Sequence, residues 1–223
     1  MSANELKVKT TLPIIIAVSG ASGTIYAFRA LQFLLENNYS THLVISESAC
    51  KVATAELELE LSLNTNQQKK QVLSYLKLPN NIDSLLNVWD FKDISASISS
   101  GSCKTGGMII IPCSMGTSSA ISNGLSDNLI TRAADVCLKE RRKLVLVPRE
   151  MPYSSIHLEN LLKLSNVGAI IAPASPGFYH KPKSLMENID FVVGKVLDLF
   201  GIEHSLFNRW KNENSLLLPN LHN

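Results

Sequence analysis

Two pairs of charged residues in the second half of the chain have the spacing of an anion-binding centre. Arg132 and Lys139 are seven residues apart, so in the helix expected over 128–142 they lie on one face, two turns apart. Two aligned cations are typical of a solvated helix face, and they also suit a clamp for an anion. Arg149 and Glu150 follow an apolar strand and stand between two prolines, whose rigid rings hold the pair in place. A charged pair held in this way is unusual in a plain loop.

A turn of small residues early in the chain could receive a phosphate. The apolar run 14–18 predicts a buried parallel strand, and apolar residues at helical spacing begin at Ile25. Between them lies SGASG (19–23), where the free N–H groups of a helix N-terminus attract anions and glycine permits a close approach. The pattern is not GxGxxG, so it does not imply a dinucleotide. It fits a phosphate or mononucleotide site, and it equally fits an ordinary strand-to-helix turn.

A second turn rich in hydrogen-bond donors, PCSMGT (112–117), follows the apolar run 108–111. Ser46 falls at the carboxyl end of another expected strand, and ligands of open α/β sheets bind at such ends. Two such turns side by side suit a flavin or a nucleotide lying across the sheet edge. The Ser- and Gly-rich stretch 94–107 fits either a flexible linker or, as we favour, the lining of the same cleft.

The elements that must position these residues alternate between strands and helices. Apolar runs predict strands at 14–18, 41–46, 87–91, 108–111, 143–147 and 168–172. Helical spacing and propensity predict helices at 25–36, 47–60, 71–76, 118–124, 128–142 (capped by Asp127), 157–165 and 184–200. The polar stretch 62–83 is interpreted as a surface excursion. The alternation predicts a single α/β domain with a doubly wound, Rossmann-like parallel sheet and right-handed crossovers.

Composition narrows the class of partner. The chain has 223 residues, enough for one such domain, and its 21 Lys and Arg against 19 Asp and Glu give no support to nucleic-acid or membrane-surface binding. No apolar run approaches the roughly 20 residues that span a bilayer, and the polar start lacks the features of a signal peptide. The scattered cysteines form no CxxC pair and fit reduced thiols better than a zinc site. We therefore expect a cytoplasmic protein without a metal.

Six segments resemble those of the UbiX/Pad family of flavin prenyltransferases. They are SGASG (19–23), SISSGS (97–102), IPCSMGT (111–117), TRAADVCLKERR (131–142), LVLVPRE (144–150) and PGFYHKP (176–182). The run of charges at fixed positions in the fourth and fifth segments is highly specific. The resemblance covers about 13–210 and implies a flavodoxin-like Rossmann domain there, between a polar N-terminal arm (1–12) and a C-terminal tail (211–223). Members of this family usually assemble as homododecamers.

The resemblance also implies a reaction. The family transfers a dimethylallyl group from dimethylallyl monophosphate to reduced FMN, first at N5 and then at C6, without a metal. The prenylated FMN then passes to a UbiD-type decarboxylase.

The site residues implied by the resemblance fall into three groups. FMN would be held by Gly20, Ala21, Ser22, Ser46, Ser114, Met115, Gly116, Thr117 and Arg149. The prenyl phosphate would be bound by Ser100, Arg132, Lys139, Glu150, Tyr179 and Lys195, some of them from adjacent subunits. Catalytic roles would fall to Ser22, Glu56, Lys139 and Glu150. Many members carry arginine where this chain has Lys195, and lysine keeps the charge but loses the two-pronged contact to phosphate.

Two other readings compete with this one. An FMN-dependent decarboxylase of cysteine-containing substrates shares the fold, but that group carries an Asn-Thr turn and a PxMNxxMW segment where this chain reads PCSMGTSSA and PREMPYSS. A non-catalytic FMN-binding subunit is the other alternative. The cations Arg132, Lys139 and Arg149, with Glu150 and Tyr179, argue against it, because storage of a flavin needs no phosphate clamp.

Overall fold

The computed structural model describes residues 12–210. The expected tail, and all of the expected arm except Leu12, lie outside the described residues. The chain divides between Ala174 and Ser175 into two compact units, which are treated separately below. Within the described part of the chain, no helix is both long enough and apolar enough to cross a membrane.

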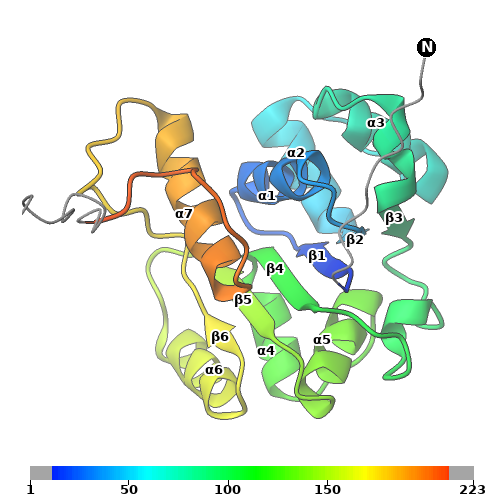
Figure 1. Ribbon diagram of the computed structural model, residues 1–223. Coiled ribbons are helices and arrows are strands. Elements are labelled where there is room, and N and C mark those ends of the chain that lie inside the picture. Colours follow the sequence, from blue (N-terminus) through cyan, green and yellow to red (C-terminus); the bar gives the residue numbers. More distant parts are fainter. Residues whose placement is uncertain (1–11, 211–223) are drawn as a thin grey trace, which may run out of the picture. The chain divides into compact units, whose positions relative to one another are not determined.

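The first unit is built on a six-stranded parallel sheet with the strand order β3-β2-β1-β4-β5-β6 (Figure 1). The strands are β1 (Ile14–Val18), β2 (Thr41–Ile45), β3 (Leu86–Trp89), β4 (Gly107–Cys113), β5 (Leu144–Pro148) and β6 (Ile170–Ile171). The order reverses between β1 and β4, and ligands of such sheets bind outside the carboxyl ends of the strands at the reversal. The predicted doubly wound, Rossmann-like sheet is confirmed.

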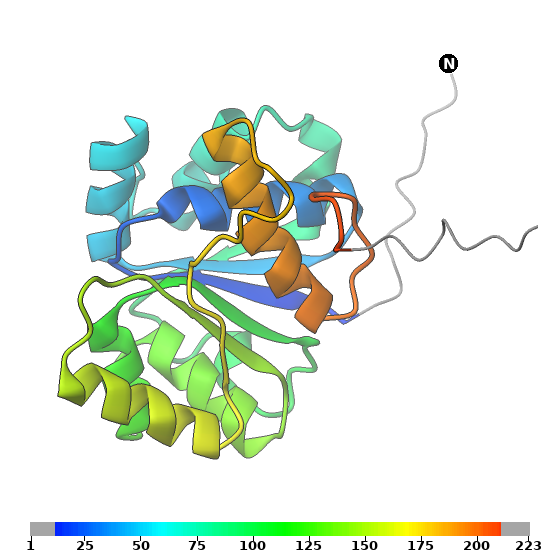
Figure 2. The same cartoon turned by 90° about the vertical axis from the view of Figure 1, so that its left-hand side faces the viewer.

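Six helices of this unit cover the two faces of the sheet (Figure 2). One face carries α1 (Thr24–Glu36), α2 (Glu47–Leu57) and α3 (Thr65–Tyr75), and the other carries α4 (Met115–Ser122), α5 (Leu129–Lys139) and α6 (Ser155–Asn166). Short 3-10 helices, η1 (Asn80–Leu85) and η2 (Ser97–Ser99), lie in the connections around β3. Because both faces are covered, every residue of β1, β4 and β5 is buried, which explains why these strands do not alternate.

Several helices begin earlier than predicted: α4 by three residues, α6 by two and α3 by six. The helix expected over 71–76 is α3, which begins six residues earlier because the Asn64 side chain accepts a hydrogen bond from the Gln67 N–H and caps it. The cap of α5 is Asn128, not Asp127. Asn128 forms a reciprocal capping box with Thr131, whose hydroxyl accepts from the Asn128 N–H.

The described part of the second unit, 175–210, contains the helix α7 (Leu185–Leu199) and the segments on either side of it. Ser184 caps the helix by accepting from the Glu187 N–H. Five of the six residues predicted to face inward are buried: Ile189, Val192, Val193, Val196 and Leu197. Leu185 is 76% exposed, because it opens the helix directly after the exposed residues Lys183 and Ser184.

Candidate active site

A buried serine joins the two turns that the sequence singled out. The Ser19 hydroxyl donates to the carbonyl of Pro112 (3.0 Å) and accepts from the Ser114 N–H (2.8 Å). Ser19 follows β1 and Ser114 follows β4, so these contacts tie the carboxyl ends of the two central strands together. Ser46 is tied to the same edge, because its N–H donates to the carbonyl of Val18 (3.0 Å). The structure therefore brings the first, second and fourth strand ends together as the sequence predicted.

The N-terminus of α1 is occupied by a carboxylate of the chain itself. Glu56, from α2, accepts hydrogen bonds from the N–H groups of Gly23 (3.0 Å) and Thr24 (3.1 Å), and from the Thr24 hydroxyl (3.0 Å). The Ser22 hydroxyl bonds to it as well. Burial raises the pKa of Glu56, but these hydrogen bonds outweigh it and the pKa is lowered. The turn 19–23 was expected to offer free donors, but the N–H groups of Ser19, Ala21 and Gly23 and the hydroxyls of Ser19 and Ser22 already have acceptors within the chain.

Gly20 serves a packing role. A Cβ at this position would lie 2.6 Å from both Cβ and Oγ of Ser48, in the first turn of α2. Glycine is therefore required for the turn 19–23 to approach the start of α2. There the Ser46 hydroxyl caps the helix by accepting from the Ala49 N–H (3.1 Å). The close approach that the sequence assigned to a ligand is made here by the protein.

The N-terminus of α4 is open. Ser114 caps it by accepting from the Thr117 N–H (3.2 Å), and its hydroxyl donates to the Thr117 hydroxyl (3.0 Å). Within 12–210, the N–H groups of Met115 and Gly116 have no protein acceptor. A Cβ at Gly116 would have nothing within 4 Å. This helix start offers free donors, a positive dipole end and room for a ligand to approach the backbone.

Arg149 reaches from the end of β5 back over the first turn. Its Nε donates to the carbonyl of Ser22 (3.3 Å) and its N–H to the carbonyl of Cys113 (3.4 Å). Glu150 beside it is exposed and accepts only from the N–H of Met151 (3.1 Å) among the hydrogen bonds found in the described residues. The strand end thus places one cation at the junction of both turns and leaves a carboxylate facing solvent.

A second cluster forms along α5 and the loop that contains Ser100. Arg132 donates through Nε to the carbonyl of Ser99 (3.2 Å) and pairs with Asp135 (2.9 Å). Lys139 pairs with Glu140, and both lie against Gly101. The predicted residues Ser100, Arg132 and Lys139 therefore flank one loop, but each of the two cations already has a carboxylate partner.

The second cluster runs along α5 from the carboxyl ends of the strands, near which Arg132 lies, to their amino ends. Helix α5 begins beside the carboxyl end of β3, where the Leu129 N–H donates to the carbonyl of Phe91 (2.9 Å), and it ends just before the amino end of β5. Lys139 therefore lies toward the amino end of β5, and Arg149 follows its carboxyl end. Five residues of strand separate these ends by about 16 Å. One chain alone does not gather all the predicted residues around one ligand.

Tyr179 and Lys195 belong to the second unit. Tyr179 makes edge-on contacts with the rings of His180, Phe191 and Trp210, at centroid distances of 5.8, 5.6 and 5.2 Å. Lys195 is exposed on α7, as the polar side of the predicted helix required. The structure describes their surroundings within this unit only.

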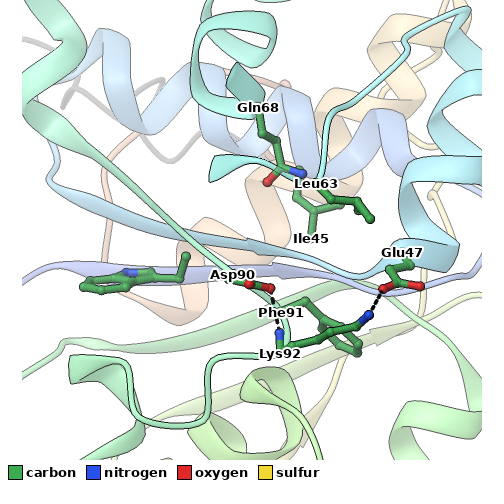
Figure 3. A pocket seen from close by; sticks show the side chains of 8 residues that line it. Ile45, Glu47, Leu63, Gln68, Asp90, Phe91 and Lys92 are labelled. Atoms are coloured by element: carbon green, nitrogen blue, oxygen red, sulfur yellow. Dashed lines mark hydrogen bonds and ion pairs between the residues drawn. The ribbon is translucent and has the colours of Figure 1, made fainter. Parts of the chain in front are cut away.

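A cavity of about 150 Å³ lies at the carboxyl ends of β2 and β3 (Figure 3). Its walls include Ile45, Leu63 and Phe91, and the pair of Glu47 with Lys92 (2.5 Å) closes one side. The sequence assigned no function to these residues, and they belong to no pattern that could have revealed one.

Cys113 and Cys137 are not placed for nucleophilic chemistry. Burial raises the pKa of Cys113 to about 12, although it stands in the second turn, and burial also raises that of Cys137 to about 12. Among the described residues, no group of three or more His, Cys, Asp and Glu side chains could hold a metal ion.

Sequence reasoning missed three supporting residues. Arg142 donates to the carbonyls of Gly101 and Cys103 and so holds the Ser100 loop on α5. Asp135 and Glu140 are the carboxylate partners of the predicted cations. The spacing of Arg132 and Asp135, three apart on a helix, could have revealed the first pair. The contacts of Arg142 span about forty residues, so no local pattern could have shown them.

A doubly wound sheet with an open, donor-lined carboxyl edge is typical of proteins that bind flavins or nucleotides. The Flavoprotein family model matches residues 2–201. A flavin prenyltransferase UbiX from Alkalihalophilus pseudofirmus is 50% identical over 195 residues, which cover 87% of this chain and 94% of the relative. The chain belongs to the UbiX flavin prenyltransferase family, and the resemblance stated from the six segments is confirmed.

Two solved structures extend this result. AnUbiX (PadA1), in complex with FMN and dimethylallyl pyrophosphate, is 40% identical with a TM-score of 0.78, covering 91% of this chain and 98% of that one. A dodecameric FMN-dependent UbiX-like decarboxylase from Escherichia coli O157:H7 is 41% identical with a TM-score of 0.77, covering 90% of this chain and all of that one.

Proposed function

We propose that this protein transfers a dimethylallyl group from dimethylallyl monophosphate to reduced FMN, at N5 and then at C6. The observation that supports this proposal most directly is the 50% sequence identity to a flavin prenyltransferase over nearly its full length. The solved relative with FMN and dimethylallyl pyrophosphate supports both the acceptor and the donor class. The product would serve a UbiD-type decarboxylase, and 13–210 would act as one flavoprotein domain. The free cysteines fit a reducing compartment such as the cytoplasm.

The residues present fit FMN. The free N–H groups of Met115 and Gly116 suit its phosphate, and the open side of Gly116 leaves room for it. The N-terminus of α1 is less suitable, because Glu56 occupies its donors and would repel an anion. We therefore assign the phosphate to the start of α4, near Ser114, with Ser46 and Arg149 at the same edge of the sheet.

The charges of the second cluster favour a monophosphate donor. Arg132 and Lys139 are each paired with a carboxylate, so the excess positive charge of the cluster comes from Arg142, whose hydrogen bonds go to two carbonyls. A monophosphate needs fewer cations than the diphosphate bound to the solved relative.

The chain's own residues would then supply the chemistry. Reduced FMN provides the nucleophilic ring and a π surface beside the developing allyl cation. Arg132, Lys139 and Lys195 neutralise the departing phosphate, which is most effective in a site without water. Glu150 would relay to the departing phosphate oxygen the proton that reduced FMN loses on alkylation, and Tyr179 would donate a hydrogen bond to another phosphate oxygen. Glu56 holds the Ser22 hydroxyl at the edge of the flavin site.

A homo-oligomer, a dodecamer as in the Escherichia coli relative, would complete the site. Lys139 and Arg149 lie at opposite ends of β5 in one chain, so a second copy must supply one of them to a shared ligand.

One assay tests this function against its rivals. The protein is incubated anaerobically with reduced FMN and dimethylallyl monophosphate, and the flavin is then extracted for mass and absorbance spectra. We expect a flavin heavier by one isoprene unit. Recovery of unmodified FMN, despite tight FMN binding, would favour a binding subunit. Carbon dioxide release from a peptide with a C-terminal cysteine would favour the cysteine decarboxylases.

A further inference from the structure

The segment 202–210, here called the C-terminal brace, packs back onto α7 at the turn that carries Lys195. Gly194 lies directly against it, because a Cβ at this position would be 2.6 Å from Cε1 of His204 and 2.7 Å from Cδ1 of Phe207. The ring of Phe207 also contacts Phe191 (5.0 Å), and Trp210 contacts Tyr179 (5.2 Å). One short segment therefore touches the surroundings of both donor-site residues of this unit.

The brace neutralises a carboxylate near Lys195. Asp198, one helical turn after Lys195, accepts from Nη1 (3.0 Å) and Nη2 (2.7 Å) of Arg209 in a two-pronged contact. The His204 ring adds a third donor, because its Nδ1 accepts from the Leu206 N–H (3.2 Å) and its Nε2 therefore holds the proton facing Asp198 (3.1 Å). Arg209 is half exposed and also lies over the Phe207 ring.

Lys195 is close enough to Asp198 to compete for it. Burial raises the pKa of Asp198, but the hydrogen bond from Arg209 and the charges around it, including that of Lys195, outweigh burial and lower the pKa. Residues three apart on a helix can form an ion pair. Without Arg209, the His204 ring would still donate to Asp198, and Lys195 would be the remaining lysine or arginine whose charge acts on this carboxylate.

We propose that Arg209 is a positioning residue, which neutralises Asp198 and so keeps Lys195 available to the phosphate of the prenyl donor. The inference rests on the proposed function, in which Lys195 binds that phosphate. Arg209 itself need not touch the donor. The effect of Arg209 depends on Asp198. Removing Arg209 alone should therefore weaken donor binding, and removing the charge of Asp198 as well should restore it.

The test is the affinity of the FMN-loaded, full-length protein for dimethylallyl monophosphate, measured by calorimetry. Lys195→Ala should weaken donor binding, and Lys183→Ala, an exposed lysine before the same helix, should not. Arg209→Ala should raise the donor Kd about two- to fivefold, the range for a partly exposed ion pair. Arg209→Lys, which keeps the charge without the fork, should have a smaller effect. Asp198→Asn with Arg209→Ala should return the Kd to near that of the parent.

The outcomes distinguish a wrong role for Arg209 from a wrong assignment of Lys195 to the donor site. If the parent protein does not bind the donor, or if Lys195→Ala has no effect, the assigned donor site is wrong and this inference falls with it. If Lys195→Ala weakens binding but Arg209→Ala does not, the inference alone is wrong. If the double variant stays as weak as Arg209→Ala, Arg209 supports the fold of the brace and does not act through Asp198. Thermal melting of Arg209→Lys and Arg209→Ala checks that each variant is folded.

Discussion

Glu56 and Glu150 show how one residue type takes two different tasks. Glu56 faces four donors at the start of α1, which is where a carboxylate stabilises the end of a helix. Glu150 has a single backbone donor and faces solvent at the end of β5. Both are glutamates that the family resemblance placed in catalysis. Only Glu56 also has a structural task that the described residues define.

Matched substitutions separate these tasks. In the FMN-free protein at neutral pH, Glu56→Gln should lower the free energy of unfolding by about 0.5–1 kcal/mol, the low end for a lost helix cap because the site is partly exposed. This corresponds to a fall of about 1–4 °C in Tm for a chain of this size. Glu150→Gln should leave Tm unchanged and slow prenyl transfer by on the order of 10²-fold, because the change removes the proton donor.

The difference in Tm between the parent and Glu56→Gln should depend on pH, and the lowered pKa of Glu56 gives the direction. The pKa of Glu56 is lowered in the folded state, so its stabilisation is present above the ordinary glutamate pKa of about 4.3 and is lost as pH falls through the lower folded pKa. The gap in Tm between the parent and Glu56→Gln should therefore shrink in acid. A gap that persists in acid, or its absence at neutral pH, would show that Glu56 does not act as the cap.

At the level of elements, the two strand-to-helix turns are similar in sequence, but they differ in which backbone N–H groups remain free to bind a ligand. The start of α1 is filled by Glu56, whereas the start of α4 keeps the N–H groups of Met115 and Gly116 open. The difference comes from α2, which carries Glu56 and whose first turn is packed against Gly20. A neighbouring helix thus decides which turn can receive a phosphate.

The same substitution at two glycines should therefore have opposite consequences. Gly116→Ala adds a methyl group to open space at a helix start, so the free protein should keep or slightly gain stability. Its FMN affinity should fall at least about tenfold, because the methyl group takes up ligand space and costs contacts of the charge-assisted kind. Gly20→Ala should instead lower Tm, because it forces the turn away from Ser48. Calorimetry with FMN and thermal melting measure both, and an unchanged FMN affinity in Gly116→Ala would move the phosphate away from α4.

At the level of the whole molecule, the proposed site has to be shared between copies. The carboxyl edge supplies Arg149, and the last residue of α5, Lys139, lies toward the amino ends of the strands. An assembly of identical subunits can bring these surfaces together, because each copy presents one to its neighbour.

Mixed assemblies test this sharing directly. Arg149→Ala and Lys139→Ala should each be nearly inactive in prenyl transfer when made alone. Co-expressed in equal amounts, they should regain about a quarter of the parent activity, because random pairing leaves that fraction of shared sites intact. Co-expression of two different substitutions within the carboxyl edge, Arg149→Ala and Ser114→Ala, serves as the control and should restore little. No recovery in the first mixture would place both residues in the site of a single chain.

The sequence by itself determined the class of fold and the positions of its central strands. Runs such as 14–18 and 144–148 are apolar throughout because helices cover both faces of the sheet, and that pattern is visible without coordinates. It also determined which turns carry donors, and the specific run 131–150 pointed to the family. Helix starts such as those of α3 and α5 were less certain, because several nearby residues can serve as the cap.

The tertiary structure alone decided which of those groups are free. Glu56 reaches the start of α1 across 32 to 33 residues of chain, Arg142 reaches Gly101 across 41, and Arg209 reaches Asp198 across 11. These partners are far apart in the sequence and meet only because the fold brings them together. The spacing of residues along the chain therefore does not predict such contacts. For this reason the sequence could name the donors and cations of the site, and only the packing of α2 and of the C-terminal brace shows which of them are already paired.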